Sequence, residues 1–247
     1  MKKIVLFLGF CFFLLSGLYA QEMRGLRFGL QTSPQWSWLS TSDKKLEGVS
    51  SNWGVKLGMI GEYYFANNYA FTTGLGFGFN QGGFIQNGYT RGVFWDDSEL
   101  SASNLDTMPL NAKLHYRLNY VEIPIGLKMR GGSNEDSRIK FYAEIPVFTL
   151  GFVSKATGDI RGTNSQNTDD ENIRKDVNGL SLTWGLGGGI EYELATNATL
   201  VAGLTFQKQF TDLTDDSGTV EKSGNSWVKD KSKATFGLLA FRIGLFF

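Results

Sequence analysis

Charged side chains recur at alternate positions in several segments of this sequence, on the side opposite the apolar residues. If these segments are strands around a narrow interior, the charges must pair or be hydrated, because an isolated buried ion costs on the order of several kcal/mol. The pattern predicts a plug of ion pairs, with a proton path or a ligand site as the alternative. The five basic and five acidic residues are Arg27, Lys56, Lys128, Lys140 and Arg242, and Glu62, Glu122, Glu144, Glu191 and Glu193.

A Glu-Ile-Pro triplet occurs twice, with its first and last residues at Glu122 and Pro124 and at Glu144 and Pro146. If the two copies lie on one hairpin symmetric about Asn134, Glu122 pairs with Pro146 and Pro124 pairs with Glu144. Proline donates no ladder hydrogen bond and is normally excluded from central strands. The repeat therefore predicts a weakened or bulged wall beside two glutamates. We interpret it as a structural bulge that bends the hairpin, and a lateral contact or gate is the alternative.

Two further groups of residues lie outside the alternating segments. Acidic clusters occur within 96–99, 169–171 and 212–216, but none has the spacing of a calcium loop, so we expect solvated loops and no metal site. Between 83 and 110, acidic residues are mixed with aromatic ones, a composition that suits contact with a partner protein. The aromatic residues of this candidate partner loop are Phe84, Tyr89, Phe94 and Trp95.

The elements that would position these residues are eight strands. Strict alternation of apolar and polar residues predicts strands at 25–40, 52–66, 69–80, 112–130, 138–154, 179–194, 198–210 and 233–247. The last nine residues are the clearest case, because Leu239, Phe241, Ile243, Leu245 and Phe247 alternate up to a terminal aromatic. Chain termini normally fray in water, so this apolar face favours a lipid-facing strand.

The connections between these strands alternate in length. Short turns at 66–68, 131–137 and 195–197 alternate with longer segments at 41–51, 83–110, 155–178 and 211–232. Bacterial outer-membrane barrels show this pattern, with an even number of strands and with the turns and both termini in the periplasm. The sequence thus predicts an all-β fold, a transmembrane eight-stranded antiparallel up-and-down barrel that contacts outer-membrane lipid. Every strand exceeds the roughly 9–11 residues needed to cross, so we expect the barrel to project beyond the membrane.

The N-terminal residues predict export. Lys2 and Lys3 precede an apolar run from Ile4 to Leu15, and Ala20 provides a small residue at the cleavage position. We expect a signal peptide at 1–20 that is cleaved, and a single barrel domain at 21–247. Cys11 lies in the signal peptide, so the mature chain has no cysteine.

Composition excludes other classes of function. The 24 basic residues include Lys2 and Lys3, which leaves 22 against 24 acidic residues in the mature chain, so nothing indicates nucleic-acid binding. An eight-stranded barrel has an interior that side chains fill, which argues against a diffusion pore. No segment suggests a small-molecule substrate or a cofactor.

Catalysis finds little support. His115 is the only histidine, and the alternation places it on the lipid side with Val121 and Ile123. Ser101 or Ser103 could approach His115, but nothing in the spacing predicts a nucleophile beside a general base. We expect no enzyme, and an acyl-chain enzyme that depends on His115 is a minor alternative.

The mature chain resembles the PorT family of outer-membrane barrels over essentially its whole length. The resemblance is sharpest at 120–128, Tyr-Val-Glu-Ile-Pro-Ile-Gly-Leu-Lys, with support from 57–65, 187–192 and 242–244. The resemblance implies a barrel in a bacterium with two membranes, and no catalysis. The family takes its name from a component of the type IX secretion system, so it implies an accessory role in secretion and contacts with secretion components. Many relatives share only the barrel, and a stand-alone structural or adhesive barrel is therefore the alternative.

Overall fold

The computed structural model describes residues 25–101, 105–132, 137–162, 167–222 and 226–247. The expected signal peptide at 1–20 lies outside the described residues and stays a prediction. The strands are β1 Leu26–Thr41, β2 Leu46–Ala66, β3 Tyr69–Asn87, β4 Arg91–Val93, β5 Met108–Pro109, β6 Lys113–Gly131, β7 Ile139–Arg161, β8 Asn167–Asn172, β9 Leu180–Ala195, β10 Ala198–Gln209, β11 Thr219–Lys222, β12 Ser226–Lys229 and β13 Ala234–Phe246. Over these residues, no helix is long and apolar enough to cross a membrane.

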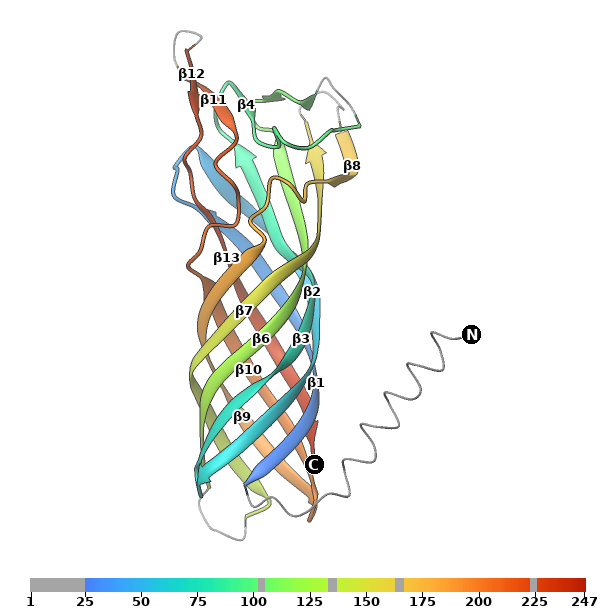
Figure 1. The fold of residues 1–247 in the computed structure, drawn as a ribbon, viewed down its shortest axis with the longest axis vertical. Helices are drawn as coiled ribbons and strands as arrows, with labels where there is room; N and C mark the ends of the chain where they lie inside the picture. Colours follow the sequence, from blue (N-terminus) through green and yellow to red (C-terminus); the bar gives the residue numbers. More distant parts are fainter. Residues whose placement is uncertain (1–24, 102–104, 133–136, 163–166, 223–225) are drawn as a thin grey trace, which may run out of the picture.

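Eight of the strands close into a ring (Figure 1). The order is β1, β2, β3, β6, β7, β9, β10 and β13; each strand pairs antiparallel with the next, and β13 pairs with β1. This confirms the predicted eight-stranded up-and-down barrel. We call the end with the short connections the turn end and the opposite end the loop end. Phe247 lies at the turn end, where it exchanges backbone hydrogen bonds with Phe28 of β1.

The outer surface of the barrel is apolar because the alternation turns every second side chain outward. Exposed apolar residues cover all eight strands, for example Leu57 on β2, Phe77 on β3 and Leu204 on β10. A soluble protein rarely exposes apolar surface of this extent. The barrel therefore presents a continuous surface for lipid.

Aromatic side chains mark both edges of this surface. Towards the loop end, Trp36 packs on Trp53 with ring centroids 4.1 Å apart, and Trp38 lies 6.3 Å from Phe206. At the turn end the exposed aromatic residues include Phe28, Tyr63, Phe65, Tyr69, Tyr192 and Phe247. Aromatic rings favour the interface between membrane and water, so the two groups fit the aromatic girdles of a membrane barrel.

The barrel continues beyond the outward apolar surface at the loop end. Strands β2, β3, β6 and β7 contain 21, 19, 19 and 23 residues, well above the roughly 9–11 needed to cross a bilayer. A second sheet in the order β12-β11-β4-β5 lies over this end (Figure 1). Much of the sequence expected as long loops is therefore strand. The segment 41–51 is the extreme case, since only residues 42–45 separate β1 from β2.

The loop-end interior is an apolar core like that of a soluble protein. Leu114, Leu118 and Ile160 are at most 1% exposed and pack with Met108 and Leu213 from the connections. A closed ring that rises above the membrane encloses space that must be filled, and apolar side chains gain most from leaving water. The interior is thus apolar at the loop end, whereas within the membrane it carries the charged residues.

The predicted register of the β6–β7 hairpin is wrong. The sequence prediction paired Glu122 with Pro146 and Pro124 with Glu144, on the assumption of a hairpin symmetric about Asn134. The structure pairs each of these residues with a different partner, so the two triplets do not face each other. The observed pairs are Glu122 with Gly151, Pro124 with Thr149, and Lys128 with Glu144.

Most of the difference arises at the turn. Gly131 pairs with Phe141, so the hairpin is centred two residues beyond Asn134 and every partner moves by four positions. A register shift between Gly126 and Lys128 moves the later pairs by one more, and the β7–β9 register shifts between Glu144 and Val147. Pro146 lies inside both shifts and cannot donate a ladder hydrogen bond. The predicted bulge thus occurs at the second triplet, whereas the first triplet pairs regularly with β7 and is interrupted only on the β3 side, where the ladder skips Ile123 and Pro124.

Candidate functional site in the barrel lumen

The lumen near the turn end holds a cluster of buried ion pairs. Lys128 of β6 lies 2.6 Å from Glu62 of β2 and also bonds Glu191 of β9. Arg27 of β1 approaches Glu191 at 3.3 Å and Glu62 at 3.6 Å. Alternation turns all four side chains inward, and ring closure brings strands that are distant in the sequence together. Two carboxylates are thus shared by two cations within the barrel.

Sequence reasoning missed two members of this cluster, Arg130 and Tyr64. The Arg130 guanidinium lies 4.1 Å from the centroid of the Tyr64 ring, and its Nη1 lies 3.9 Å from Glu191. The Tyr64 hydroxyl donates a 2.9 Å hydrogen bond to Glu62. Both residues lie two positions beyond an inward charge, so the same alternation could have found them.

A second ion pair joins β13 to β7. Arg242 Nη1 donates to Glu144 Oε2 at 2.7 Å, and both side chains are buried. Glu144 is the cross-strand neighbour of Lys128, but the Lys128 ammonium points to Glu62 and Glu191 instead. The charges of Arg242 and Glu144 therefore neutralise each other beside the first cluster.

A third group lies nearer the loop end. Lys56 donates to Glu122 at 2.8 Å and to the side-chain oxygen of Gln207 at 2.9 Å. Gln81 donates to the other oxygen of Glu122 at 2.5 Å, and Gln207 donates onward to Thr149 at 2.8 Å. The amide side chains of Gln81 and Gln207 thus extend the hydrogen-bond network of this ion pair across the lumen. Eight of the ten predicted charges thus form ion pairs with each other.

Buried polar atoms near this third group have no hydrogen-bond partner among the described residues. Ordered water normally satisfies such groups when the chain does not. The middle of the lumen is therefore a polar layer between the ion pairs and the apolar core. The side chains concerned include Gln35, Gln81, Tyr120, Ser181, Thr183 and Thr205.

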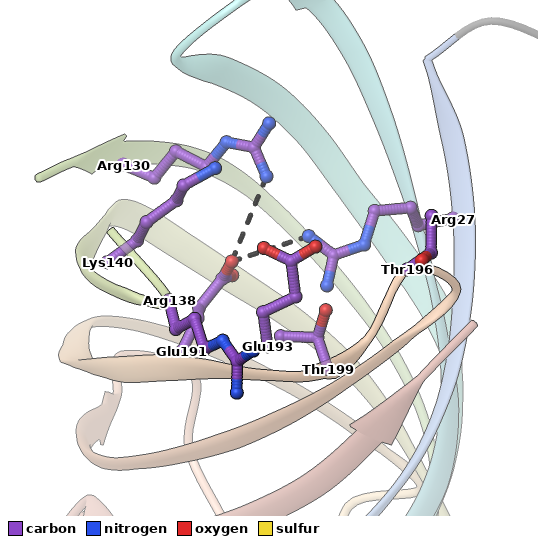
Figure 2. A pocket seen from close by; sticks show the side chains of 8 residues that line it. All are labelled: Arg27, Arg130, Arg138, Lys140, Glu191, Glu193, Thr196 and Thr199. Carbon is purple, nitrogen blue, oxygen red and sulfur yellow. Dashed lines mark hydrogen bonds and ion pairs between the residues drawn. The ribbon is translucent and has the colours of Figure 1, made fainter. Parts of the chain in front are cut away.

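The remaining two predicted charges, Lys140 and Glu193, lie at the turn-end mouth of the barrel. Neither forms an ion pair with another described residue. They line a pocket of about 170 Å³ together with Arg27, Arg130, Arg138, Glu191, Thr196 and Thr199 (Figure 2). The sequence prediction placed them in the plug, whereas the structure places them at its solvent-facing edge, because β7 and β9 end there.

The candidate partner loop is largely buried, which corrects the prediction. Tyr89 and Trp95 are 5% and 2% exposed in the loop-end core, where Trp95 packs edge-on against Tyr116. Phe94 packs partly buried against the same core, and Phe84 belongs to β3 and stacks on His115. Tyr89 and Trp95 are inward because large side chains fill the space enclosed at the loop end, whereas Phe84 shares the outward face with His115. They offer little surface to a partner.

His115 lies on the outward face by alternation, but side chains surround it. Its Nδ1 lies 2.9 Å from Asp159 and its Nε2 lies 2.7 Å from the side-chain oxygen of Asn52. Burial lowers the pKa of His115, although Asp159 opposes the shift. Ser101 instead donates its hydroxyl to Glu171. Ser101 is therefore not a nucleophile beside His115, and Ser103 lies outside the described residues.

Acidic residues of three loop-end connections converge on one point. Carboxylate oxygens of Asp97, Asp176 and Asp215 lie within 4.8 Å of one another. Asp176 is buried and accepts hydrogen bonds from the Asp97 N–H at 2.9 Å and from the Ser98 hydroxyl. Burial raises the pKa of Asp176, with Asp215 and Asp97 adding to the shift. Because the chain itself bonds Asp176, we interpret this cluster as an anchor for the connections.

A closed ring with an apolar outer surface and ion pairs inside defines the class of transmembrane β-barrels. A family model described as "Outer membrane protein beta-barrel domain" matches residues 19–208, and the chain belongs to this family. The protein is therefore an outer-membrane barrel whose apolar surface contacts lipid. No curated protein sequence matches the chain.

The chain is similar to several solved structures of outer-membrane proteins. A major outer membrane protein from Thermus thermophilus is 13% identical with a TM-score of 0.43, covering 91% of this chain and 99% of that one. OprG from Pseudomonas aeruginosa is 12% identical with a TM-score of 0.42, covering 90% and 97%. Neisserial surface protein A is 13% identical with a TM-score of 0.39, covering 88% and 95%.

Proposed function

We propose that this protein is a closed, non-enzymatic barrel that acts by contact with other proteins and is an accessory component of type IX secretion. The observation that carries the first part is the filled lumen. Three ion-paired groups occupy the membrane-spanning interior, and an apolar core fills the loop end. A solute could cross the barrel only by displacing both the ion pairs and the apolar core. The protein therefore acts through its outer surfaces.

The buried charges act in this proposal as a plug that joins opposite walls. Most of the pairs connect strands that are not neighbours in the ring, such as β13 with β7 and β2 with β6. A proton path would need a continuous polar route to both ends. The loop-end core around Leu118 and Phe236 interrupts such a route, which favours the plug over a path.

The absence of catalysis is part of the proposal. Both ring nitrogens of His115 face side-chain oxygens, and Ser101 bonds Glu171, so neither is poised for acyl transfer. The variant His115→Gln should leave any lipid-modifying activity of native membranes intact. Loss of such an activity in this variant would contradict the proposal.

The secretion role rests on the resemblance to the PorT family. In the proposed orientation, the turn end and both termini face the periplasm, and the loop end faces outward. A tagged chain would be extracted from native outer membranes in detergent, and co-purifying proteins identified by mass spectrometry. We expect secretion components in the eluate, and a strain that lacks this protein should fail to secrete the substrates of the type IX system.

A stand-alone structural or adhesive barrel is the second candidate. It is favoured by the ordered loop-end extension, in which the sheet β12-β11-β4-β5 presents a folded surface. This candidate predicts recovery of the barrel alone and normal secretion in the deletion strain. That pair of results would overturn the secretion role and leave the closed barrel unchanged.

A further inference from the structure

The turn-end mouth of the barrel carries more positive than negative charge. Four basic side chains line its pocket, Arg27, Arg130, Arg138 and Lys140, and only two acidic ones, Glu191 and Glu193. The described part of the pocket therefore has an excess of two positive charges. The ion pairs deeper in the lumen, in contrast, match Lys56 with Glu122 and Arg242 with Glu144.

The acidic residues of the pocket cannot neutralise this excess. Glu191 already contacts Lys128, Arg27 and Arg130. Arg138 and Lys140 form no ion pair with a described carboxylate, although Lys140 lies opposite Glu191 in the β7–β9 ladder. Among the described residues, no carboxylate pairs with either of these two cations.

Figure 2 shows how these groups are arranged. Arg130 and Lys140 lie on one side of the pocket, Arg27 lies on the opposite side, and Glu191 and Glu193 lie between them. Arg27 uses Nη1 for Tyr64 and Glu191, whereas its buried Nη2 has no hydrogen-bond partner among the described residues. A buried guanidinium nitrogen without an acceptor is costly, and an oxyanion would supply one.

From this geometry we propose that the turn-end pocket binds a carboxylate group of a polypeptide, either an acidic side chain or a C-terminus. The volume of about 170 Å³ holds about five groups of water size, which suits a carboxylate with a short carbon stem. A singly charged carboxylate can pair with Arg138 and Lys140. A phosphate dianion could pair with the same cations, so the competition between phosphate and acetate below separates the two anions.

The proposal goes beyond the role in secretion and does not depend on it. The pocket opens to water at the turn end, so in the proposed orientation the ligand is a periplasmic polypeptide. Binding would be measured on the purified full chain, whereas the secretion role is tested in cells. Failure of either experiment therefore leaves the other unaffected.

The test is an NMR titration of the detergent-solubilised protein with two capped peptides at about 50 mM salt, where charge interactions are weakly screened. The peptides, Gly-Glu-Gly and Gly-Gln-Gly, are N-acetylated and C-amidated and differ only in the carboxylate. We expect the glutamate peptide to bind about ten-fold more tightly. Acetate should compete, and inorganic phosphate at equal ionic strength should compete no better.

The double variant Arg138→Gln, Lys140→Gln should weaken binding of the glutamate peptide about ten-fold. Its matched control is Lys113→Gln, Lys155→Gln, which removes two exposed cations at the loop end and should leave binding unchanged. A difference in electrophoretic mobility between unheated and heated samples would verify that both variants fold.

Four results would overturn the proposal. Equal affinity for both peptides, or no binding of either, would exclude a carboxylate site. Unchanged binding in the Arg138 and Lys140 variant would place the ligand elsewhere. Stronger competition by phosphate than by acetate would assign the pocket to a phosphoryl group instead.

Discussion

Glu144 and Arg242 lie 98 residues apart in the sequence, yet their side chains form a 2.7 Å ion pair inside the barrel. The pair joins β7 to β13, two strands that are not neighbours in the ring. Side chains that cross the lumen in this way tie opposite walls together.

Breaking this pair should destabilise the barrel strongly. Glu144→Ala leaves the Arg242 guanidinium buried without a counter-charge, and we expect a loss of about 3–5 kcal/mol in the free energy of unfolding. The double variant Glu144→Met, Arg242→Met should be far milder, since no lone charge remains. Urea unfolding in lipid vesicles would measure both. Arg161→Ala, which breaks the exposed pair with Asp169, should cost at most about 1 kcal/mol. Equal losses in the single and double variants would contradict the pairing.

Some glycines of the barrel wall leave no room for a side chain, whereas others do. At Gly189 an added Cβ would overlap the backbone oxygen of Ala202 on β10, so Gly189→Ala should cost about 1–3 kcal/mol. At Gly131 an added Cβ meets nothing within 4 Å, and Gly131→Ala is the matched control. The same vesicle assay applies. An unchanged free energy of unfolding in Gly189→Ala would show that the strands can separate at this point.

Trp95 should behave as a core residue. Trp95→Ala removes a ring that is 2% exposed and packs on Tyr116, so we expect a loss of about 3–5 kcal/mol. Hydrogen exchange of the loop-end strands would detect the loss directly. Trp227→Ala, at a residue 41% exposed, should change exchange little. If Trp95→Ala instead spared stability and removed binding of a partner, the partner-loop hypothesis would return.

Acid should weaken the loop-end extension. Burial alone would raise the pKa of Asp159, but hydrogen bonds from the Asp170 N–H and His115, with the charge of Arg117, lower it below its ordinary value of 3.8. The pKa of His115 is also lowered from 6.5, chiefly by burial. Both groups therefore bind protons more readily in the unfolded state, and stability falls as pH falls.

For His115 this loss begins near pH 6.5, and for Asp159 it begins near pH 3.8. Hydrogen exchange of the loop-end amides between about pH 7 and pH 4, corrected for intrinsic rates, would follow the first step. His115→Gln should remove that step while leaving the second. Stability that rises on acidification would show that the charged imidazole is the favoured form.

The filled lumen predicts an electrically silent barrel. Wild-type protein in planar bilayers should give no stable conductance steps, because the ion pairs and the core around Leu118 leave no continuous aqueous route. Regular ohmic steps at modest voltage would contradict the closed barrel. They would also support the alternative in which the lumen charges form a proton path.

The sequence alone determined the strands and the faces of their side chains. Alternation with a period of two is a local property, so eight strands and their inward charges could be predicted without knowledge of pairing. The same rule extends to Arg130 and Tyr64, which share the inward face with Lys128 and Glu62. The apolar surface and its aromatic edges follow from the same pattern.

Only the tertiary structure decided which residues meet. The hairpin register depends on where the turn is centred and on the bulge beside Pro146, which together give Glu122 the partner Gly151. The partner of Arg242 depends on the closure of the whole ring, which no local pattern specifies. Trp95 is buried because distant strands enclose a space above the membrane that its ring fills. Pairing and enclosure are non-local, whereas alternation is local, and that difference separates what the sequence predicted from what required the structure.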